Sequence, residues 1–386
     1  MSRIGLALAR SLGRAGVPVT GIAFREAHIG VGSRYVTHRH ILTGAPPETR
    51  DRQILEAIRG AARTERPALF PDDDDSVDFI LRYWDEVTGL AELPLPGDPG
   101  VVQALRRKER LPAVAAEAGV PAPATAAIRG ERDLRESGLR PPVLIKPVEG
   151  KRFEHVFHTK AFVASDLEAA VAGWRRASEH GFETIAQELV PDALDRIFSV
   201  FTYVGREGEP LVSVVGRKLR QLPVPFGSST AFEVRWEPRA LELAAQLLRS
   251  AGYRGLAHVE FAYDRRDRSL KLLEVNTRAP IWASVALDGG SLDIARVAFA
   301  DLSGLRPAAV GAVVTEERYW VDLTRDLVQA TRRRDLHPVR FLRPYLRRKK
   351  ARAVFAADDP APALSWAVYL GRRAVKSIRF YSSAAA

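Results

Sequence analysis

Two glutamates and an asparagine near residue 270 have the types and spacing of a divalent-cation site. Glu274 and Asn276 lie two residues apart in the stretch 270–276, so in a strand their side chains share one face. Glu260 lies in the preceding stretch, 257–263, and a hairpin of the two would place it beside Glu274. Carboxylate and amide oxygens suit Mg²⁺. The pattern predicts a magnesium site, and scattered acids on a solvated sheet face are the alternative.

Lysine is scarce in this chain, which makes each lysine position informative. Arginine supplies 49 of the 58 basic residues and lysine only nine. The first 150 residues contain just Lys108 and Lys146. Lys146 ends the apolar stretch 143–146, where an ammonium group is costly to leave unpaired. Lys108 alone would be read as a surface lysine, but together with Lys146 it favours an anion-binding site.

Five segments of the chain occur in an order that is typical of one enzyme superfamily. They resemble the ATP-grasp superfamily of carboxylate–amine ligases over residues 100 to 305, and most of all its carboligases related to D-alanine and D-aspartate ligases. The amino-terminal part resembles the α/β domain that precedes the ATP-grasp fold in that superfamily. The segments are RRKERLPAVAAEAGVPAPAT (106–125), VLIKPVEG (143–150), IAQELVPD (185–192), GLAHVEF (255–261) and LLEVNTR (272–278).

The resemblance implies that ATP binds between two lobes and assigns residues to it. The ammonium groups of Lys108 and Lys146 would reach the phosphates. An acidic residue, Glu188 or Asp195, would bind the ribose hydroxyls. The linker strand whose backbone would hold the adenine comprises Gln187, Glu188, Leu189 and Val190.

The same resemblance implies how the reacting groups are held. Lys218, with Arg217, would meet the γ-phosphate, and Arg278 would steady the acyl-phosphate and the tetrahedral intermediate. One or two magnesium ions, with manganese as the alternative, would be bound by Glu260, Glu274 and Asn276. A substrate carboxylate would attack the γ-phosphate, and an amine would then displace phosphate from the acyl-phosphate. The protein would contribute positioning and charge stabilisation.

Two alternative functions are compatible with the sequence. One is an ATP-grasp kinase that phosphorylates a hydroxyl group of a small molecule. The other is a non-catalytic nucleotide-binding protein that docks on anionic partners. Two departures from the family pattern also matter: the segment after Lys146 contains one glycine where a glycine-rich loop is usual, and NTRAPIW (276–282) lacks the Pro-Gly of D-alanine ligases. The second departure argues against D-alanine as the substrate.

Alternating helix-like and strand-like stretches predict an α/β and α+β architecture in four parts. A Rossmann-like α/β domain is expected over 1–97, ending at the Pro/Gly-rich PLPGDPG (94–100). The ATP-grasp small lobe is expected over 98–190, the large lobe over 191–305 and a basic helical extension over 306–386. The first domain opens on a helix where a strand is usual: either its first strand lies upstream of Met1, which we expect, or the domain has lost that strand.

Composition excludes several classes of protein. Without cysteine the chain has no disulfide framework, thiolate nucleophile or zinc finger. With neither a secretory signal nor a run of about 18 apolar residues, we expect a cytoplasmic enzyme that acts on a small carboxylate and an amine, with a homodimer as one assembly. Most of the net charge of +11 lies in 318–352, where twelve Lys or Arg oppose three Asp. This argues against a specific nucleic-acid partner. It leaves three interpretations: a solvated face, peripheral contact of 318–380 with an anionic membrane, or a surface that receives an acidic substrate or carrier.

Overall fold

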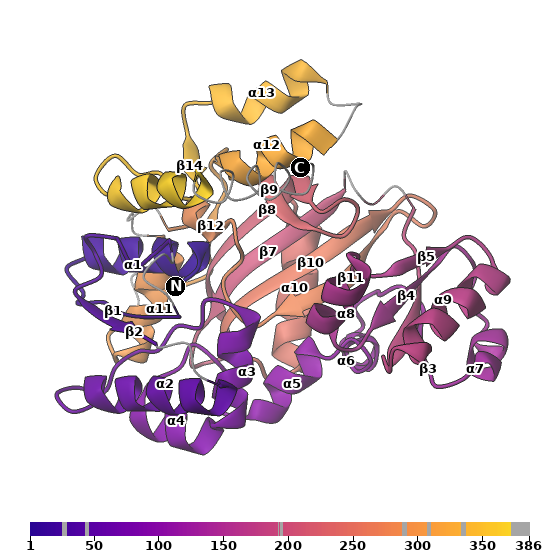
Figure 1. The fold of residues 1–386 in the computed structure, drawn as a ribbon, viewed down its shortest axis with the longest axis horizontal. Helices are drawn as coiled ribbons and strands as arrows, with labels where there is room; N and C mark the ends of the chain where they lie inside the picture. Colours follow the sequence, from indigo (N-terminus) through magenta and orange to yellow (C-terminus); the bar gives the residue numbers. More distant parts are fainter. Residues whose placement is uncertain are drawn as a thin grey trace, which may run out of the picture. The chain divides into compact units, whose positions relative to one another are not determined.

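The computed structural model describes residues 1–24, 29–42, 46–191, 193, 196–287, 292–306, 310–332 and 337–371. The chain divides into two compact units (Figure 1). Unit 1 comprises Met1–Pro94, Arg278–Ala309 and Ala351–Ala386, and unit 2 comprises Leu95–Thr277 and Val310–Lys350. The first boundary lies three residues before the expected one, whereas the expected extension over 306–386 is divided between the units.

Unit 2 contains a four-stranded antiparallel sheet of order β3-β6-β4-β5. Helix α9 packs on it because Ala170 and Val171 share a buried cluster with Ile145 of β4. This sheet and its helices lie within the range 98–190 that was expected for the small lobe. Its elements are β3 (Thr125–Ile128), α7 (Glu131–Glu136), β4 (Val143–Pro147), α8 (Gly150–Phe157), β5 (Phe162–Ala164), α9 (Leu167–Glu179) and β6 (Thr184–Glu188).

The second sheet of unit 2 has eight strands in the order β11-β10-β7-β8-β9-β13-β14, with β12 paired to β8. Helix α10 (Pro238–Ser250) covers it through Leu243 and Leu247. Helices α5 (Pro99–Arg106) and α6 (Leu111–Glu117) were expected in the small lobe, but they bury Leu105 and Ala115 in this same core. The strands are β7 (Ile197–Val204), β8 (Pro210–Leu222), β9 (Ser228–Val234), β10 (Gly255–Asp264), β11 (Ser269–Asn276), β12 (Ala312–Val314), β13 (Tyr319–Val321) and β14 (Lys350–Arg352).

The segment after residue 310 belongs to unit 2 because it completes this sheet. Strand β13 pairs with β9, and α12 (Leu323–Arg332) follows it, with α13 (Pro338–Leu346) further on. Asp326 of α12 is fully buried and accepts hydrogen bonds from Arg220 Nε at 2.8 Å and from Thr230 Oγ1 at 2.7 Å. These long-range contacts explain why residues 310–350 do not form a separate extension.

Unit 1 has a small parallel sheet of two strands, β1 (Thr20–Ala23) and β2 (His38–Ile41). The helices that the structure describes in this unit are α1 (Arg3–Arg14), α2 (Pro47–Ala61), α3 (Asp74–Arg82), α4 (Trp84–Leu90), α11 (Ile294–Leu302) and a further helix over 361–371. A short 3₁₀ turn, η2, spans Ala283–Val285. Asp73 caps α3 by accepting from the Ser76 backbone N–H at 2.8 Å, so this aspartate run starts a helix.

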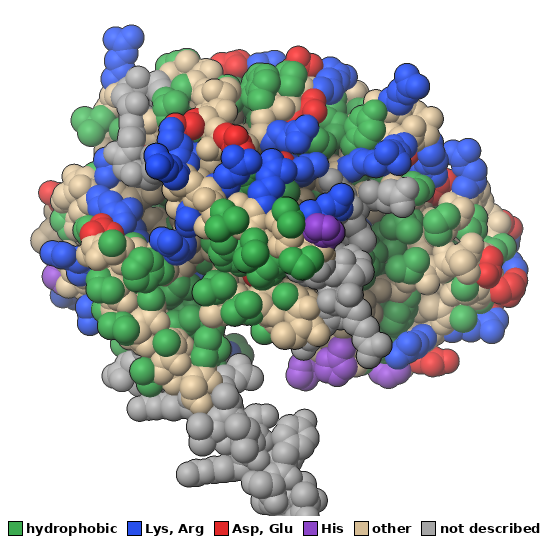
Figure 2. All heavy atoms as spheres, turned by 90° about the horizontal axis from the view of Figure 1, so that it is seen from above, with side chains coloured by type: hydrophobic (Ala, Val, Ile, Leu, Met, Phe, Trp, Pro, Cys, Tyr) green, Lys and Arg blue, Asp and Glu red, His purple; other side chains and the backbone are tan. Residues whose placement is uncertain are grey.

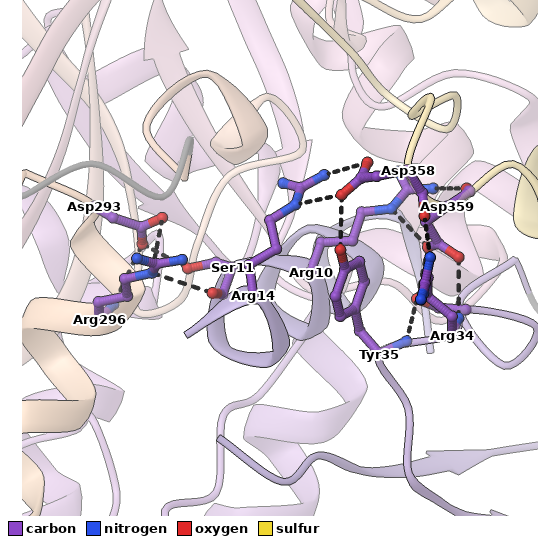
Figure 3. A network of polar contacts seen from close by, with 10 residues as sticks. Arg10, Ser11, Arg14, Arg34, Tyr35, Asp293, Arg296, Asp358 and Asp359 are labelled. Carbon is purple, nitrogen blue, oxygen red and sulfur yellow. Dashed lines mark hydrogen bonds and ion pairs between the residues drawn. The ribbon is translucent and has the colours of Figure 1, made fainter. Parts of the chain in front are cut away.

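The carboxyl-terminal part of unit 1 is held to α1 by a network of charges (Figure 3). Arg10 Nε donates to Asp359 Oδ2 at 2.9 Å, and both side chains are buried. Arg14 forms a two-pronged pair with Asp358, at 2.8 and 2.9 Å. These pairs join residues nearly 350 positions apart, which explains why 351–371 lies with the amino-terminal segment and not with 310–350.

Figure 2 shows Lys and Arg side chains separated by hydrophobic ones on the face that it presents. Among the described residues, no helix has both the length and the apolar character needed to cross a bilayer.

Candidate active site

Glu260 and Glu274 face each other across the β10–β11 hairpin. The antiparallel register pairs Glu260 with Glu274 and His258 with Asn276. Because alternate residues of a strand share a face, all four side chains lie on the same side of the hairpin. The hairpin geometry expected from the sequence is therefore confirmed, including the approach of the two carboxylates.

Lys218 of β8 is the cation closest to Glu260. Its Nζ lies 3.1 Å from Glu260 Oε1 and 3.2 Å from Oε2, and both side chains are buried. Ser199 of β7 donates a further hydrogen bond to Oε1 at 3.1 Å. Burial raises the pKa of Glu260, and the nearby charge of Glu274 raises it further, while Lys218 opposes the shift. Glu260 is thus held in place by a paired cation at the floor of the site.

Glu274 sits in a different electrostatic environment from Glu260. Its side chain reaches solvent and accepts a hydrogen bond from Asn276 Nδ2 at 3.0 Å. Partial desolvation would raise the pKa of Glu274, but the charges of Lys218 and Lys160 outweigh it and lower the pKa to about 2. Glu274 is therefore ionised at any physiological pH, as a metal ligand must be.

Lys108 and Lys146 meet beside this hairpin. Lys146, on β4, donates from Nζ to Gln187 Oε1 at 2.7 Å, and Lys108, in the turn after α5, donates to the Pro147 carbonyl at 2.7 Å. Desolvation lowers the pKa of Lys146 to about 8, and the neighbouring Lys108 charge adds to this shift. Desolvation also lowers the pKa of Lys108, whereas the Glu274 charge opposes it. Two ammonium groups so placed repel each other, and an anion between them would relieve that repulsion.

Sequence reasoning missed a fourth lysine, Lys160. Its charge acts on both Glu274 and Lys108, so it lies at the same site. It follows α8, in the segment after Lys146 where the family pattern has a glycine-rich loop; Phe153 and Phe157 of this helix pack against Phe162, with ring centroids 5.0 Å apart. The scarcity of lysine is the sequence feature that could have indicated Lys160, since four of the nine lysines lie at this site.

The linker segment, residues 187–190, begins in strand β6 of the four-stranded sheet and continues beyond its end. Gln187 and Glu188 belong to β6, which pairs with β4, and Leu189 N–H donates to the Pro142 carbonyl at 2.9 Å. The Glu188 carboxylate is buried and accepts from the Arg140 backbone N–H at 2.9 Å. Val190 is buried as well. Asp195, the other candidate for the ribose, lies outside the described residues.

Two arginines that were expected at the site pair with acidic residues of their own units. Arg217 precedes Lys218 on β8, so its side chain points to the other face, where its guanidinium lies 2.8 Å from Glu233 Oε1. Arg278 belongs to unit 1, where its guanidinium forms a two-pronged pair with Asp74 at 2.8 and 3.0 Å. The structure thus groups Lys108, Lys146, Lys218 and the hairpin acids, but it does not bring Arg217 to them.

The residues at the hairpin fit magnesium better than a cation that needs a full protein cage. Among the described residues, no group of three or more His, Asp or Glu side chains is arranged to hold a metal by itself. Mg²⁺ is commonly bound through one or two carboxylates plus substrate phosphates. Glu260 and Glu274, with the Asn276 amide beside them, supply that donor set.

Comparison with known proteins identifies the fold. No protein-family model matches the sequence, and no curated protein sequence matches it significantly. Solved structures do match. An ADP complex of N5-carboxyaminoimidazole ribonucleotide synthetase has a TM-score of 0.65 at 13% identity, covering 86% of this chain and 83% of that one. The biotin carboxylase domain of Hydrogenobacter thermophilus 2-oxoglutarate carboxylase has a TM-score of 0.62 at 15% identity, covering 79% and 68%.

A third match supports the same conclusion. N5-carboxyaminoimidazole synthetase from Staphylococcus aureus has a TM-score of 0.62 at 11% identity, covering 82% of this chain and 79% of that one. At these identities the likeness establishes the architecture and leaves the chemistry to be argued from the residues.

Proposed function

The chain has the ATP-grasp fold, and on that premise we propose that it is an ATP- and magnesium-dependent carboxylate–amine ligase that releases ADP and phosphate. The similar structures include complexes with ATP, with ADP and with the magnesium salt of ADP. They support nucleotide binding by the fold. The assignment to this chain depends on the charges of its own site.

One observation carries the proposal: four lysines surround two carboxylates at a single site. Lys108, Lys146 and Lys160 act electrostatically on the same cluster in which Lys218 contacts Glu260. Glu109 also acts on Lys108, so four positive charges stand against three negative ones and leave an excess that a polyphosphate would neutralise. Holding charged ammonium groups together in a partly desolvated site is unfavourable. The lowered pKa values of Lys108 and Lys146 reflect this free-energy cost.

The lysines and the hairpin residues are assigned different roles. Lys108 and Lys146 would bind oxygens of the transferring end of ATP as compact point charges. Glu260 and Glu274, with Asn276, would hold magnesium, which supplies charge neutralisation at the phosphates.

Lys218 would come to the γ-phosphate, because its ammonium already lies at the base of the metal site, 3.1 Å from Glu260. The Glu188 carboxylate is engaged by the Arg140 backbone, so we assign the ribose to Asp195 and the adenine to the backbone of residues 187–190. Arg278 is proposed to act on the acyl-phosphate only after leaving Asp74.

The reaction balances without a protein nucleophile. An oxygen of the substrate carboxylate bonds to the γ-phosphorus as the bond to the β-phosphate oxygen breaks and ADP leaves. The amine nitrogen then bonds to the acyl carbon, the carbon–oxygen bond to phosphate breaks, and the amine loses a proton. Lysine charges stabilise the phosphoryl oxygens in the first step. The absence of cysteine is compatible with this route.

Trapping of the intermediate tests the proposal. With ATP, magnesium and a panel of carboxylates, hydroxylamine should yield a hydroxamate together with stoichiometric ADP, since an acyl-phosphate reacts in this way. ADP and a phosphorylated product without hydroxamate would instead support the kinase alternative. No nucleotide turnover with any acceptor, alongside tight nucleotide binding, would support the non-catalytic alternative.

The assembly and cellular location of this ligase are further parts of the proposal. The Hydrogenobacter thermophilus biotin carboxylase domain was solved as a dimer. We propose a homodimer that works in the cytoplasm, and light scattering of the purified protein tests the dimer directly. A mass near 42.6 kDa, that of one chain, would contradict it.

A further inference from the structure

His258 is a buried residue of the β10–β11 hairpin to which the proposed ligase chemistry gives no role. The antiparallel registers place it directly opposite Asn276 of β11 and directly opposite Phe201 of β7. Only 6% of His258 is exposed, and Phe201 is fully buried. Directly opposed side chains of neighbouring strands lie close enough to interact. The polar cross-strand partner of the imidazole ring is therefore the Asn276 amide.

Hydrogen bonds around Asn276 fix which way its amide lies. Asn276 Nδ2 donates to Glu274 Oε1 at 3.0 Å and lies 3.3 Å from His258 Nδ1. An ionised carboxylate only accepts hydrogen bonds, so the amide atom that contacts Glu274 must be the nitrogen. The second N–H of this nitrogen is then available to His258 Nδ1, which must accept it. A neutral imidazole whose Nδ1 accepts carries its proton on Nε2.

This arrangement leaves the oxygen of Asn276 as the available end of the amide. Among the residues that the structure describes, no donor forms a hydrogen bond with Asn276 Oδ1. An amide oxygen can bind Mg²⁺, whereas the amide nitrogen would present its N–H groups to the cation. The two ends of an amide have nearly the same size. A metal site that uses Asn276 therefore needs a partner that selects one of the two orientations.

Glu274 cannot select this orientation alone, because its carboxylate is itself assigned to the cation. A carboxylate that turns towards a metal ion has fewer lone pairs left for the amide. His258 is held in place by burial in β10, and its Nε2 lies 3.6 Å from Glu260 Oε1. Its two ring nitrogens therefore approach proposed metal-binding residues of both strands.

We propose that His258 is a positioning residue that keeps the oxygen of the Asn276 amide available to the divalent cation. The proposal rests on the proposed function for the metal site, and it adds a residue that acts through Asn276. In the described ranges, no three His, Asp or Glu side chains are arranged to hold a metal, which argues against His258 as a further direct ligand. Removing the hydrogen-bond partner of a metal ligand commonly weakens metal binding by about ten- to hundredfold.

Binding of Mn²⁺ to the full chain in the presence of ADP tests the proposal, with the electron paramagnetic resonance signal of free Mn²⁺ as the readout. His258→Asn keeps an acceptor at the place of Nδ1, because both atoms are bonded to the γ-carbon. His258→Gln is the matched variant, since it also carries a primary amide but places it one bond further out. We expect His258→Gln to weaken Mn²⁺ binding about ten- to hundredfold, and His258→Asn to weaken it about threefold at most.

A double variant separates positioning from direct coordination. In an Asn276→Ala chain, His258→Gln should cause no further loss of Mn²⁺ affinity, because the residue that His258 positions is gone. A full additional loss would overturn the proposal and make His258 itself a ligand. Equal affinities of the His258→Asn and His258→Gln chains would also overturn it, as would the absence of Mn²⁺ binding by the wild-type chain.

The tautomer of His258 provides a test that needs no stable variant. In ¹⁵N–¹H correlation spectra of the wild-type chain, the ring proton should be on Nε2, and a proton on Nδ1 would overturn the proposal. None of these readouts requires turnover. Hydroxamate formation with equal affinities of the two variants would retain the ligase and reject the role of His258. Unequal affinities without any hydroxamate would retain the role of His258 and reject the ligase.

Discussion

Two clusters of charged residues differ in how their charges are matched. In unit 1, Arg10 and Arg14 each pair with an aspartate of the carboxyl-terminal segment, Asp359 and Asp358 respectively (Figure 3). In unit 2, four lysines surround two glutamates, and burial lowers the pKa values of Lys108 and Lys146. The first cluster is satisfied by its own residues, whereas the second holds an excess of positive charge. The difference teaches that a matched arginine–aspartate network indicates a structural role, whereas an unmatched lysine cluster indicates a ligand-binding site.

The largest expected effect comes from neutralising an acid of the unmatched cluster. Glu274→Gln keeps the size of the side chain but removes the charge that we assign to magnesium, and we expect kcat to fall about 10³-fold. ADP release measures this change. The matched control is Asp267→Asn on the same hairpin, whose carboxylate pairs with Lys271 away from the site. Similar activity of both variants would remove Glu274 from the mechanism.

Breaking the matched cluster should affect stability and not catalysis. Asp359→Ala leaves the Arg10 guanidinium buried and without its carboxylate, which is expected to cost about 3–5 kcal/mol of unfolding free energy. Asp358→Ala, at a partly exposed pair, should cost about 0.2–1 kcal/mol. Urea unfolding measures both changes. An Asp359 variant with wild-type stability but reduced turnover per folded molecule would contradict the division between the clusters.

Lys160 provides a smaller test of the unmatched cluster. Lys160→Met removes one ammonium group and should raise KM for ATP about ten- to hundredfold, since a charge-assisted contact contributes about 1.5–3 kcal/mol. Lys151→Met, on α8, serves as a control in the same segment. An unchanged KM would show that Lys160 is a surface lysine with no contact to the nucleotide.

The pH dependence of ATP binding gives the mildest test. Burial lowers the pKa of Lys146 to about 8, so in the free enzyme its charge is present below pH 8 and is lost above it. KM for ATP should therefore rise above pH 8 by about one log unit per pH unit. Lys146→Arg, which stays charged, should flatten the profile. If KM for ATP still rises above pH 8 in this variant, the titrating group is not Lys146.

Local sequence patterns predicted the residues that share strands. Alternation over 257–276 placed Glu260 and Glu274 on one face, and the register confirms their approach. The same alternation places the side chains of Arg217 and Lys218 on opposite faces of the strand. The orientation of Arg217 could therefore have been predicted from the sequence. Lys160 was not predicted, because no alternation or motif in the glycine-poor segment after Lys146 indicates where its side chain lies.

Long-range pairing could not be predicted from local patterns. The burial of Asp326 depends on Arg220, more than one hundred residues earlier, and that of Asp359 depends on Arg10 at the other end of the chain. The helical periodicity of residues 306–386 does not indicate which sheet or helix each part of this segment packs against. The division of that segment between the two units follows from these partners.

The central claim is that the lysine cluster of unit 2 binds the phosphates of ATP, and calorimetric titration with magnesium and ATP tests it directly. We predict that the wild-type chain binds and that Lys146→Met weakens binding at least tenfold at pH 7. Lys271→Met, whose lysine pairs with Asp267, should bind like the wild type. Equal affinity of the Lys146 variant and the wild type would contradict the account.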